Sequence, residues 1–298
     1  MRSVLALICK TISIVNMAPT TEKLQAVVYQ VRRDIVRMVH GCQSGHPGGS
    51  LGCTELLVAL YHEVMTHNPA FEADGIGEDL FFLSNGHISP VWYSVLAHAG
   101  YFPKAELGTF RKLNSRVQGH PATHEGLPGI RVASGSLGQG ISVAIGAAQA
   151  KKLNHDDKLV YVLTGDGELQ EGQNWEAIMY AAHNKVNNLV LIVDYNGQQI
   201  DGPVDKINTL GNLRAKMEAF GWNVLEQAKG NDLEAIIGSL TEAKALLAET
   251  KPVVILLKTE MGNGVDFMMN SHKWHGIAPN DEQLAAALAQ NPETLGDY

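Results

Sequence analysis

The sequence predicts an α/β fold in which a parallel sheet is flanked by helices on both faces. Short apolar runs rich in Val, Leu and Ile recur at residues 159–163, 189–194 and 253–258, and stretches with helical spacing lie between them. Continuous apolar runs of this length are typical of strands that are buried on both faces. Alternation of such strands with helices is typical of a parallel sheet that is covered on both sides.

The first predicted element is an amphipathic helix over residues 22–40. Apolar residues recur there at helical spacing, with three arginines on other faces: Leu24, Val27, Val28, Val31, Ile35 and Val39, against Arg32, Arg33 and Arg37. A glycine-rich turn is expected at residues 44–50, after which Thr54 is expected to cap a second helix that ends near Met65.

Further helices are predicted between and after the first two strands, at residues 174–184, 211–220 and 231–249. The segment 262–276, which is rich in Gly and Met, is expected to form a mobile active-site loop.

The first sixteen residues contain a short apolar stretch that Lys10 interrupts. The stretch is too short to span a bilayer, and no clear cleavage site follows it. We expect residues 1–18 to form a flexible N-terminal extension, with Met17 as an alternative start. Residues 19–298 are expected to form one domain.

Composition narrows the class of protein. Hydrophobic residues make up 45% of the chain and charged residues 18%, which is typical of a globular protein. The net charge of -8 disfavours general binding to nucleic acid or to an anionic membrane surface. Cys9, Cys42 and Cys53 have no zinc-ligand spacing and form no even set, so a reducing, cytoplasmic setting is expected.

Two strand ends predict a metal–diphosphate site. The strand at 159–163 leads into Gly-Asp-Gly at residues 165–167, and the next strand leads into Asp-Tyr-Asn-Gly-Gln at 194–198. Because neighbouring parallel strands end side by side, we expect the Asn196 side-chain oxygen and the Gln198 carbonyl to meet a cation held by Asp166. Glycine also lets backbone amides approach an anion. Ordinary turns are the alternative, but they do not account for paired oxygen ligands.

Four of the twelve histidines stand beside glycine in predicted loops: His46, His87, His120 and His275. Any one of them alone is as well explained as an ordinary surface or core histidine. Neutral imidazoles can bond sugar hydroxyls and move protons at physiological pH, so the group as a whole points to a site for a hydroxylated substrate.

These motifs together resemble those of a known family. Gly-Asp-Gly at one strand end, followed after a helix by Asn at the next, is similar to the thiamine diphosphate signature. Five further stretches resemble transketolases in order and spacing: SGHPGGSLG at 44–52, LSNGHISP at 83–90, QGHP at 118–121, GSLGQGIS at 135–142 and WHG at 274–276. The likeness runs from about residue 22 to about residue 280. It implies a thiamine-diphosphate-binding fold, with thiamine diphosphate and Mg²⁺ as cofactors, Ca²⁺ or Mn²⁺ being substitutes for the metal.

The resemblance also implies roles for single residues. His46, His120 and His275 match catalytic positions that face the sugar, and His275 also faces the diphosphate. The other matched positions bind the cofactor or its metal: His87, Gly135, Ser136, Leu137, Gly167, Glu171 and Asn196 for the cofactor, and Asp166, Asn196 and Gln198 for the metal. Glu171 matches an acidic residue near the dimer interface, although a solvated glutamate at a helix start is equally compatible with the sequence.

In transketolases the glutamate that protonates the pyrimidine ring lies in a second domain, and this chain ends at Tyr298 before that domain would begin. The resemblance therefore implies the N-terminal subunit of a split transketolase. With a companion C-terminal subunit it would transfer a two-carbon ketol unit from a ketose phosphate to an aldose phosphate, as in pentose phosphate metabolism. Two copies of each chain would form a heterotetramer with homodimer contacts.

Three alternatives stay open at the level of sequence. The chain could be a subunit of another thiamine enzyme, of the 2-oxoacid dehydrogenase or deoxyxylulose-phosphate synthase type. It could also be a non-catalytic binding or regulatory subunit with the same fold. A dinucleotide-binding enzyme is disfavoured because no G-x-G-x-x-G follows the strand at 159–163.

Overall fold

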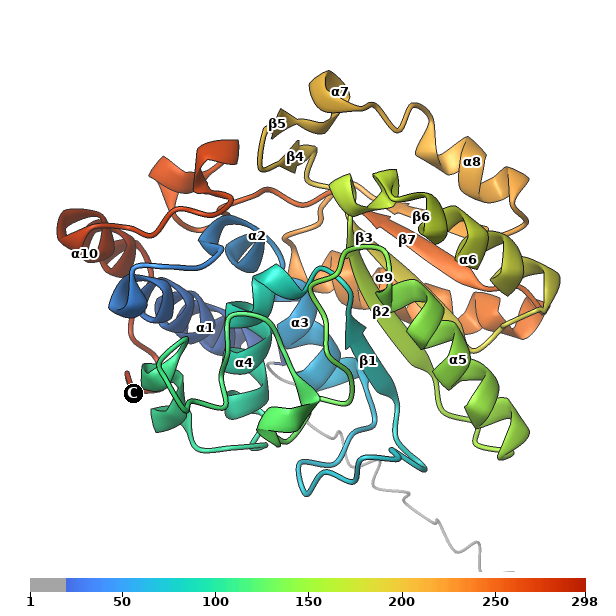
Figure 1. Ribbon diagram of the computed structural model, residues 1–298, viewed down its shortest axis with the longest axis horizontal. Coiled ribbons are helices and arrows are strands. Elements are labelled where there is room, and N and C mark those ends of the chain that lie inside the picture. Colours follow the sequence, from blue (N-terminus) through green and yellow to red (C-terminus); the bar gives the residue numbers. More distant parts are fainter. Residues whose placement is uncertain (1–19) are drawn as a thin grey trace, which may run out of the picture.

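The structure is a computed structural model that describes residues 20–298, and it confirms the predicted α/β architecture. Five parallel strands form one sheet in the order β1-β2-β3-β7-β6, with helices on both faces (Figure 1). Residues 1–18, for which we predicted a flexible extension, lie outside the described residues, as does Met17.

The elements occur along the chain as follows. The strands are β1 (Leu80–Leu83), β2 (Val160–Gly165), β3 (Leu189–Asp194), β6 (Asn223–Gln227) and β7 (Val253–Leu257), with a short antiparallel pair β4 (Gln198–Gln199) and β5 (Gly202–Pro203). The helices are α1 (Thr20–Cys42), α2 (Pro47–Gly52), α3 (Thr54–Ala59), α4 (Ser89–His98), α5 (Gly140–Leu153), α6 (Gly172–His183), α7 (Val204–Ile207), α8 (Leu213–Ala219), α9 (Leu233–Leu246) and α10 (Asp281–Gln290).

Two hydrophobic cores cover the two faces of the sheet, because successive strand side chains point to opposite sides. Tyr161 and Leu163 of β2 pack with α1, α3, α4 and α9, while Val160 and Val162 pack with α5, α6 and α8. In Figure 1, α5, α6 and α8 lie to the right of the sheet and α1, α3 and α4 to its left. Within residues 20–298 no helix combines the length and apolar character needed to cross a membrane.

The strands and helices that the sequence predicted are present, and others were missed. The apolar runs became β2, β3 and β7, and the predicted helices became α1, α3, α6, α8 and α9, with α3 continuing as a π-helical turn to Val64. Strand β1 was missed because it has only four residues. Strand β6 was missed because it is an edge strand with polar residues such as Asn223 and Glu226, which interrupt any apolar run.

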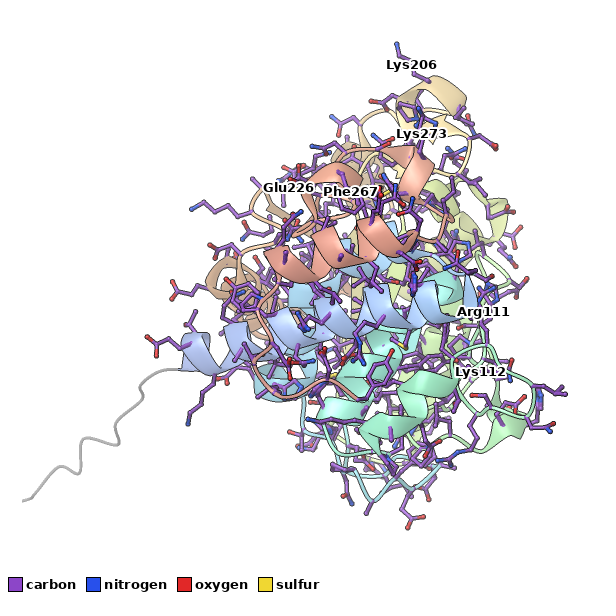
Figure 2. All side chains as sticks on the ribbon, turned by 90° about the vertical axis from the view of Figure 1, so that its left-hand side faces the viewer. Arg111, Lys112, Lys206, Glu226, Phe267 and Lys273 are labelled. Atoms are coloured by element: carbon purple, nitrogen blue, oxygen red, sulfur yellow. The ribbon has the colours of Figure 1, made fainter. Side chains whose placement is uncertain are left out.

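Helix α1 is more deeply buried than an amphipathic surface helix. Arg32 and Arg33, which we placed on other faces, are both buried. Arg32 pairs with the buried Glu55, and the Arg33 guanidinium bonds the Asp297 carboxylate at 2.7 Å. Helix α10 and the chain that follows it cover this side of α1, and Figure 2 shows the two helices packed side by side. The arginines are tolerated there because each has a carboxylate partner.

The prediction of a glycine-rich turn at 44–50 is wrong for its second half, because α2 begins at Pro47. The glycines of α2 serve close packing: a Cβ atom at Gly48 would lie 2.8 Å from the Met261 side chain, and one at Gly49 would lie 2.7 Å from Ile88. Thr54 is not a cap either. Its hydroxyl donates to the Ser50 carbonyl one turn back, and Cys53 precedes the helix.

Candidate active site

The carboxyl ends of β2 and β3 lie side by side, as the sequence predicted. Gly165 is in register with Asp194, so the loops that follow the two strands begin at the same edge of the sheet. The Asp166 carboxylate accepts hydrogen bonds from Gly167 N at 2.7 Å and from Gly197 N at 2.6 Å. Asp166 is therefore in direct contact with the turn at residues 196–198 that follows β3.

Asn196 and Gln198 complete this turn. The Asn196 side-chain oxygen accepts from Gln198 N at 2.8 Å, and its amide donates to the Asp194 carboxylate at 2.8 Å. Asp194 is itself buried and accepts from the Thr259 hydroxyl. A buried carboxylate and an amide oxygen thus lie at one strand edge, in contact with the backbone of residues 197 and 198.

Two carboxylates, Asp166 and Asp194, are buried close together at this edge. Burial, reinforced by the charge of Asp194, raises the pKa of Asp166 to about 7. A divalent cation would favour the ionised form and lower this pKa again. Within residues 20–298 no group of three or more His, Cys, Asp or Glu side chains could hold a metal ion, and the predicted ligand set contains only one such side chain.

The four histidines that the sequence singled out come together. The His46 ring centroid lies 5.0 Å from that of His87, 6.3 Å from that of His120 and 5.6 Å from that of His275. The ring centroids of His87 and His275 are 5.1 Å apart. The four rings come from separate segments: the start of α2, a 3-10 turn before α4, the loop at 118–121 and the loop after β7.

Burial keeps these imidazoles neutral. Burial lowers the pKa of His46 to about 4, with further contributions from His275, Arg111 and His120. Burial is likewise the main cause that lowers the pKa values of His87, His120 and His275. Neutral rings can both donate and accept hydrogen bonds, as the binding of hydroxyl groups requires.

One cavity of about 390 Å³ joins the strand edge to the histidines. Its lining includes nearly every residue that the sequence predicted for the site, namely His46, His87, His120, Gly135, Leu137, Asp166, Gly167, Glu171, Asn196, Gln198 and His275. Ser136 is the exception. It lines a second cavity, with Phe82, Ser84 and Gln139.

Unpartnered polar atoms show that the cavity is built for a polar ligand. The Asn85 side-chain oxygen and the Nδ1 atoms of His46 and His275 are buried without a hydrogen-bond partner, and all three residues line the cavity. Leaving such groups unpaired is costly unless a ligand or water satisfies them. The residues present therefore fit a ligand rich in oxygen, with a cation at the Asp166 end.

The backbone conformation and the close packing at residue 135 require glycine. Its φ of +119° is left-handed, and a Cβ atom would lie 2.5 Å from the His120 ring. Glu171, by contrast, is exposed at the residue before α6, where its side chain makes no capping hydrogen bond. Its position fits both the cofactor-site role and the solvated helix-start role.

Sequence reasoning missed two residues near the histidines. Asn85 lies within one of the family-like motifs but was not chosen. Arg111 lies beyond the C-terminal end of α1 (Figure 2) and donates to the Ser44 hydroxyl at 2.8 Å. Its positive charge contributes to lowering the pKa values of His46 and His120. Nothing in its local sequence marks it, because its closeness to His46 arises from the fold.

The fold and the cavity define an α/β domain with a polar cavity at the carboxyl edge of its parallel sheet. Residues 23–292 match the family described as the transketolase, thiamine diphosphate binding domain. The chain is 35% identical over 270 residues to an apulose-4-phosphate transketolase subunit of Actinobacillus succinogenes, and the match covers 90% of this chain and 96% of that relative. It is 38% identical to the 6-deoxy-6-sulfo-D-fructose transketolase subunit SqwG of a Clostridium species, with 83% of this chain and 88% of the relative covered.

Solved structures of transketolases are also similar to this chain. The transketolase of Campylobacter jejuni superposes with a TM-score of 0.83 at 35% identity, and that of Leishmania mexicana with a TM-score of 0.84 at 32% identity. The matches cover 91% and 92% of this chain but only 43% and 42% of those proteins. The chain therefore belongs to the transketolase family, a family of transferases. It corresponds to the thiamine diphosphate-binding part, which some relatives carry as a separate subunit.

Proposed function

We propose that this chain is the N-terminal subunit of a split transketolase, with residues 19–298 as its diphosphate-binding domain. The observation that carries the proposal is a single cavity in which Asp166, Asn196 and Gln198 at one end face four neutral histidines at the other. The relatives of similar length support it, because their names describe transketolase subunits.

The metal would be held by the Asp166 carboxylate, the Asn196 side-chain oxygen and the Gln198 carbonyl. All three are oxygen donors, which Mg²⁺ prefers and which Ca²⁺ or Mn²⁺ also accept. The backbone of Gly167 would contact the diphosphate, and His87 would donate to it. Binding a dication here would also neutralise the buried charge of Asp166.

When bound, thiamine diphosphate supplies the electron sink for breaking the carbon–carbon bond beside a ketose carbonyl. The chain's own residues orient the reactants and carry protons. His46 and His120 would hold the hydroxyls of the sugar, and His275 would face both the sugar and the diphosphate. The turn at Gly135, Ser136 and Leu137 would receive the aminopyrimidine ring. Because the pKa values of the four histidines are lowered, their rings are neutral at neutral pH and can accept a hydrogen bond from a hydroxyl.

A companion subunit would cover the mouth of the cavity and supply the pyrimidine-binding domain with its catalytic glutamate. Exposed apolar side chains around the site support a partner there: Leu137, Ile200 and Ile277 are 37%, 63% and 55% exposed. We propose an assembly of two copies of each chain. Val143, Met179 and Tyr180, exposed on α5 and α6, would make contacts between copies of this chain.

The substrates we propose are a ketose phosphate as donor and an aldose phosphate as acceptor, in the cytoplasm. The names of the relatives support an anionic sugar, since one is named for apulose 4-phosphate and another for 6-deoxy-6-sulfo-D-fructose. These names also favour transketolase over the other thiamine enzymes and over a non-catalytic role.

The test is to co-purify this chain with the product of a neighbouring gene and assay ketol transfer from several ketose phosphates to several aldose phosphates. Activity that needs both chains is expected, together with Mg²⁺-dependent binding of thiamine diphosphate by this chain. Full activity of this chain alone would overturn the split arrangement. Pyruvate consumption without any ketose-donor activity would overturn transketolase in favour of another thiamine enzyme.

A further inference from the structure

The Glu168 side chain lies between two loops of the cofactor cavity and bonds to both. Its Oε1 atom accepts from Gly138 N at 2.7 Å and also from the Ser84 hydroxyl. Its Oε2 atom accepts from Gly165 N at 3.1 Å. Gly138 belongs to the turn before α5, and Gly165 to the end of β2, so one carboxylate joins segments that are almost thirty residues apart.

The chemistry of these contacts requires a carboxylate. All three partners are neutral donors, two backbone N–H groups and one hydroxyl. Glu168 is 3% exposed, so water cannot replace these bonds. A glutamine of the same shape has only one acceptor atom, and its amide group would point its own hydrogens at one of the donors. A buried donor left without an acceptor is unfavourable.

Ser84 extends the connection to the end of β1. Its hydroxyl oxygen accepts from Gly140 N at 3.0 Å while the hydroxyl donates to Glu168. The packing is close, since a Cβ atom at Gly140 would lie 2.3 Å from the Ser84 oxygen. The start of α5 is therefore fixed against β1 and β2 through Ser84 and Glu168, and the turn at 135–138 can shift only if these bonds break.

We propose that Glu168 is a positioning residue that sets the distance between the aminopyrimidine turn at 135–138 and the diphosphate loop at 165–167. The role rests on the proposed function, because it assigns the two loops to the two ends of one thiamine diphosphate. Glu168 itself need not touch the cofactor. Its effect is to hold both loops in the geometry that the whole cofactor needs, so that a fragment filling one loop alone gains little from it.

The test compares the full-length chain with Glu168→Gln and uses two measurements. Hydrogen exchange without ligand reports the bonds themselves, and we expect the Gly138 and Gly165 amides to lose about tenfold or more in protection. Titration with Mg²⁺ and either thiamine diphosphate or inorganic diphosphate reports the coupling. We expect the preference for thiamine diphosphate over inorganic diphosphate to fall about tenfold, while inorganic diphosphate itself binds within about threefold of the wild type.

A matched control is Glu242→Gln, which makes the same chemical change at an exposed position on α9 and should alter neither quantity. Ser84→Ala is the second variant: it removes one donor and keeps the carboxylate, and a smaller loss of the same preference is expected. If Glu168→Gln does not fold, the wild type still decides, because free exchange of its Gly138 amide would overturn the proposal.

The outcomes separate this inference from the proposed function. Loss of protection at both amides with an unchanged preference would overturn the positioning role. Unchanged protection of the Gly138 and Gly165 amides in Glu168→Gln would overturn the coupling of the two loops, whatever the binding result. The wild type could bind neither ligand in the presence of Mg²⁺ while its Gly138 and Gly165 amides are protected and lose that protection in Glu168→Gln. This result would overturn the proposed function and leave the coupling of the two loops supported.

Discussion

The two ends of the cavity are built in different ways. The end that carries the proposed metal ligands, which we call the metal end, lies around Asp166 and Asn196. It is formed by two adjacent strands and the short loops that follow them, and its side-chain oxygens accept hydrogen bonds from backbone N–H groups. The histidine end is formed by four side chains from segments that span residues 46 to 275. The first is a local construction, whereas the second exists only when the whole domain is folded.

The two ends also differ in charge. At the metal end, buried carboxylates lie close together, and the pKa of Asp166 is raised. At the histidine end the rings are held neutral, and the pKa of His46 is lowered. One end therefore favours a cation, and the other favours uncharged hydroxyl groups. This difference predicts that changes at the two ends affect different measurements.

The largest expected effect is that of Asp166→Asn on cofactor binding. The change removes the one carboxylate of the predicted metal set, and we expect the affinity for thiamine diphosphate in the presence of Mg²⁺ to fall by at least about 100-fold. Titration calorimetry with Mg²⁺ and then with EDTA measures it. In EDTA the variant and the wild type should bind the cofactor equally weakly.

Loss of folding is not expected in this variant. At pH 8 the change removes a buried charge, which favours the metal-free fold. It also leaves one acceptor atom where the carboxylate accepts from both Gly167 N and Gly197 N, which disfavours the fold, so we expect the two effects to offset each other to within about 1 kcal/mol in urea unfolding. Asp157→Asn, at a side chain that is 92% exposed, is the control. Unchanged Mg²⁺-dependent binding by Asp166→Asn would mean that the ion lies elsewhere, and the two strand ends would lose their proposed role.

The next effect is that of His46→Asn on turnover. In the complex with the companion subunit we expect kcat/KM to fall by about 100-fold, because a proton-carrying and hydroxyl-binding group is lost. The affinity of this chain for thiamine diphosphate should stay within about threefold. Steady-state kinetics and titration of the same preparations measure the two quantities, and His124→Asn, at a side chain that is 80% exposed, is the control. An equal loss in affinity and in turnover would contradict the division of the cavity into two ends.

The metal end was more predictable from the sequence than the histidine end. Asp166 and Asn196 were placed together because parallel strands end side by side, and the contact between Asp166 and the turn after β3 confirms that reasoning. The four histidines beside glycine indicated a shared site as a group, but their individual roles followed from the resemblance, since no spacing rule brings His46 next to His275. Glu168 was missed because its partners, Ser84 and Gly138, are distant in the chain. The start of α2 was missed because glycines chosen for close packing have the same appearance in a sequence as glycines in a turn.

The smallest expected effect is on the pH dependence of stability, and it again separates the two ends. The pKa of His46 in the folded chain is about 4, below the ordinary value of 6.5. The unfolded chain therefore binds more protons between these values, so His46 lowers the stability of the fold as pH falls from about 6.5 toward 4. Since the His46 side chain is partly exposed, we expect a contribution of only about 1 kcal/mol at pH 5. The buried carboxylates of Asp166 and Glu168 have raised pKa values and act in the opposite direction.

The quantity to measure is therefore the difference between the wild type and His46→Asn in urea unfolding at pH 7 and at pH 5, without metal. The wild type should lose more stability than the variant between the two pH values, and an equal loss would show that His46 is not held neutral by burial.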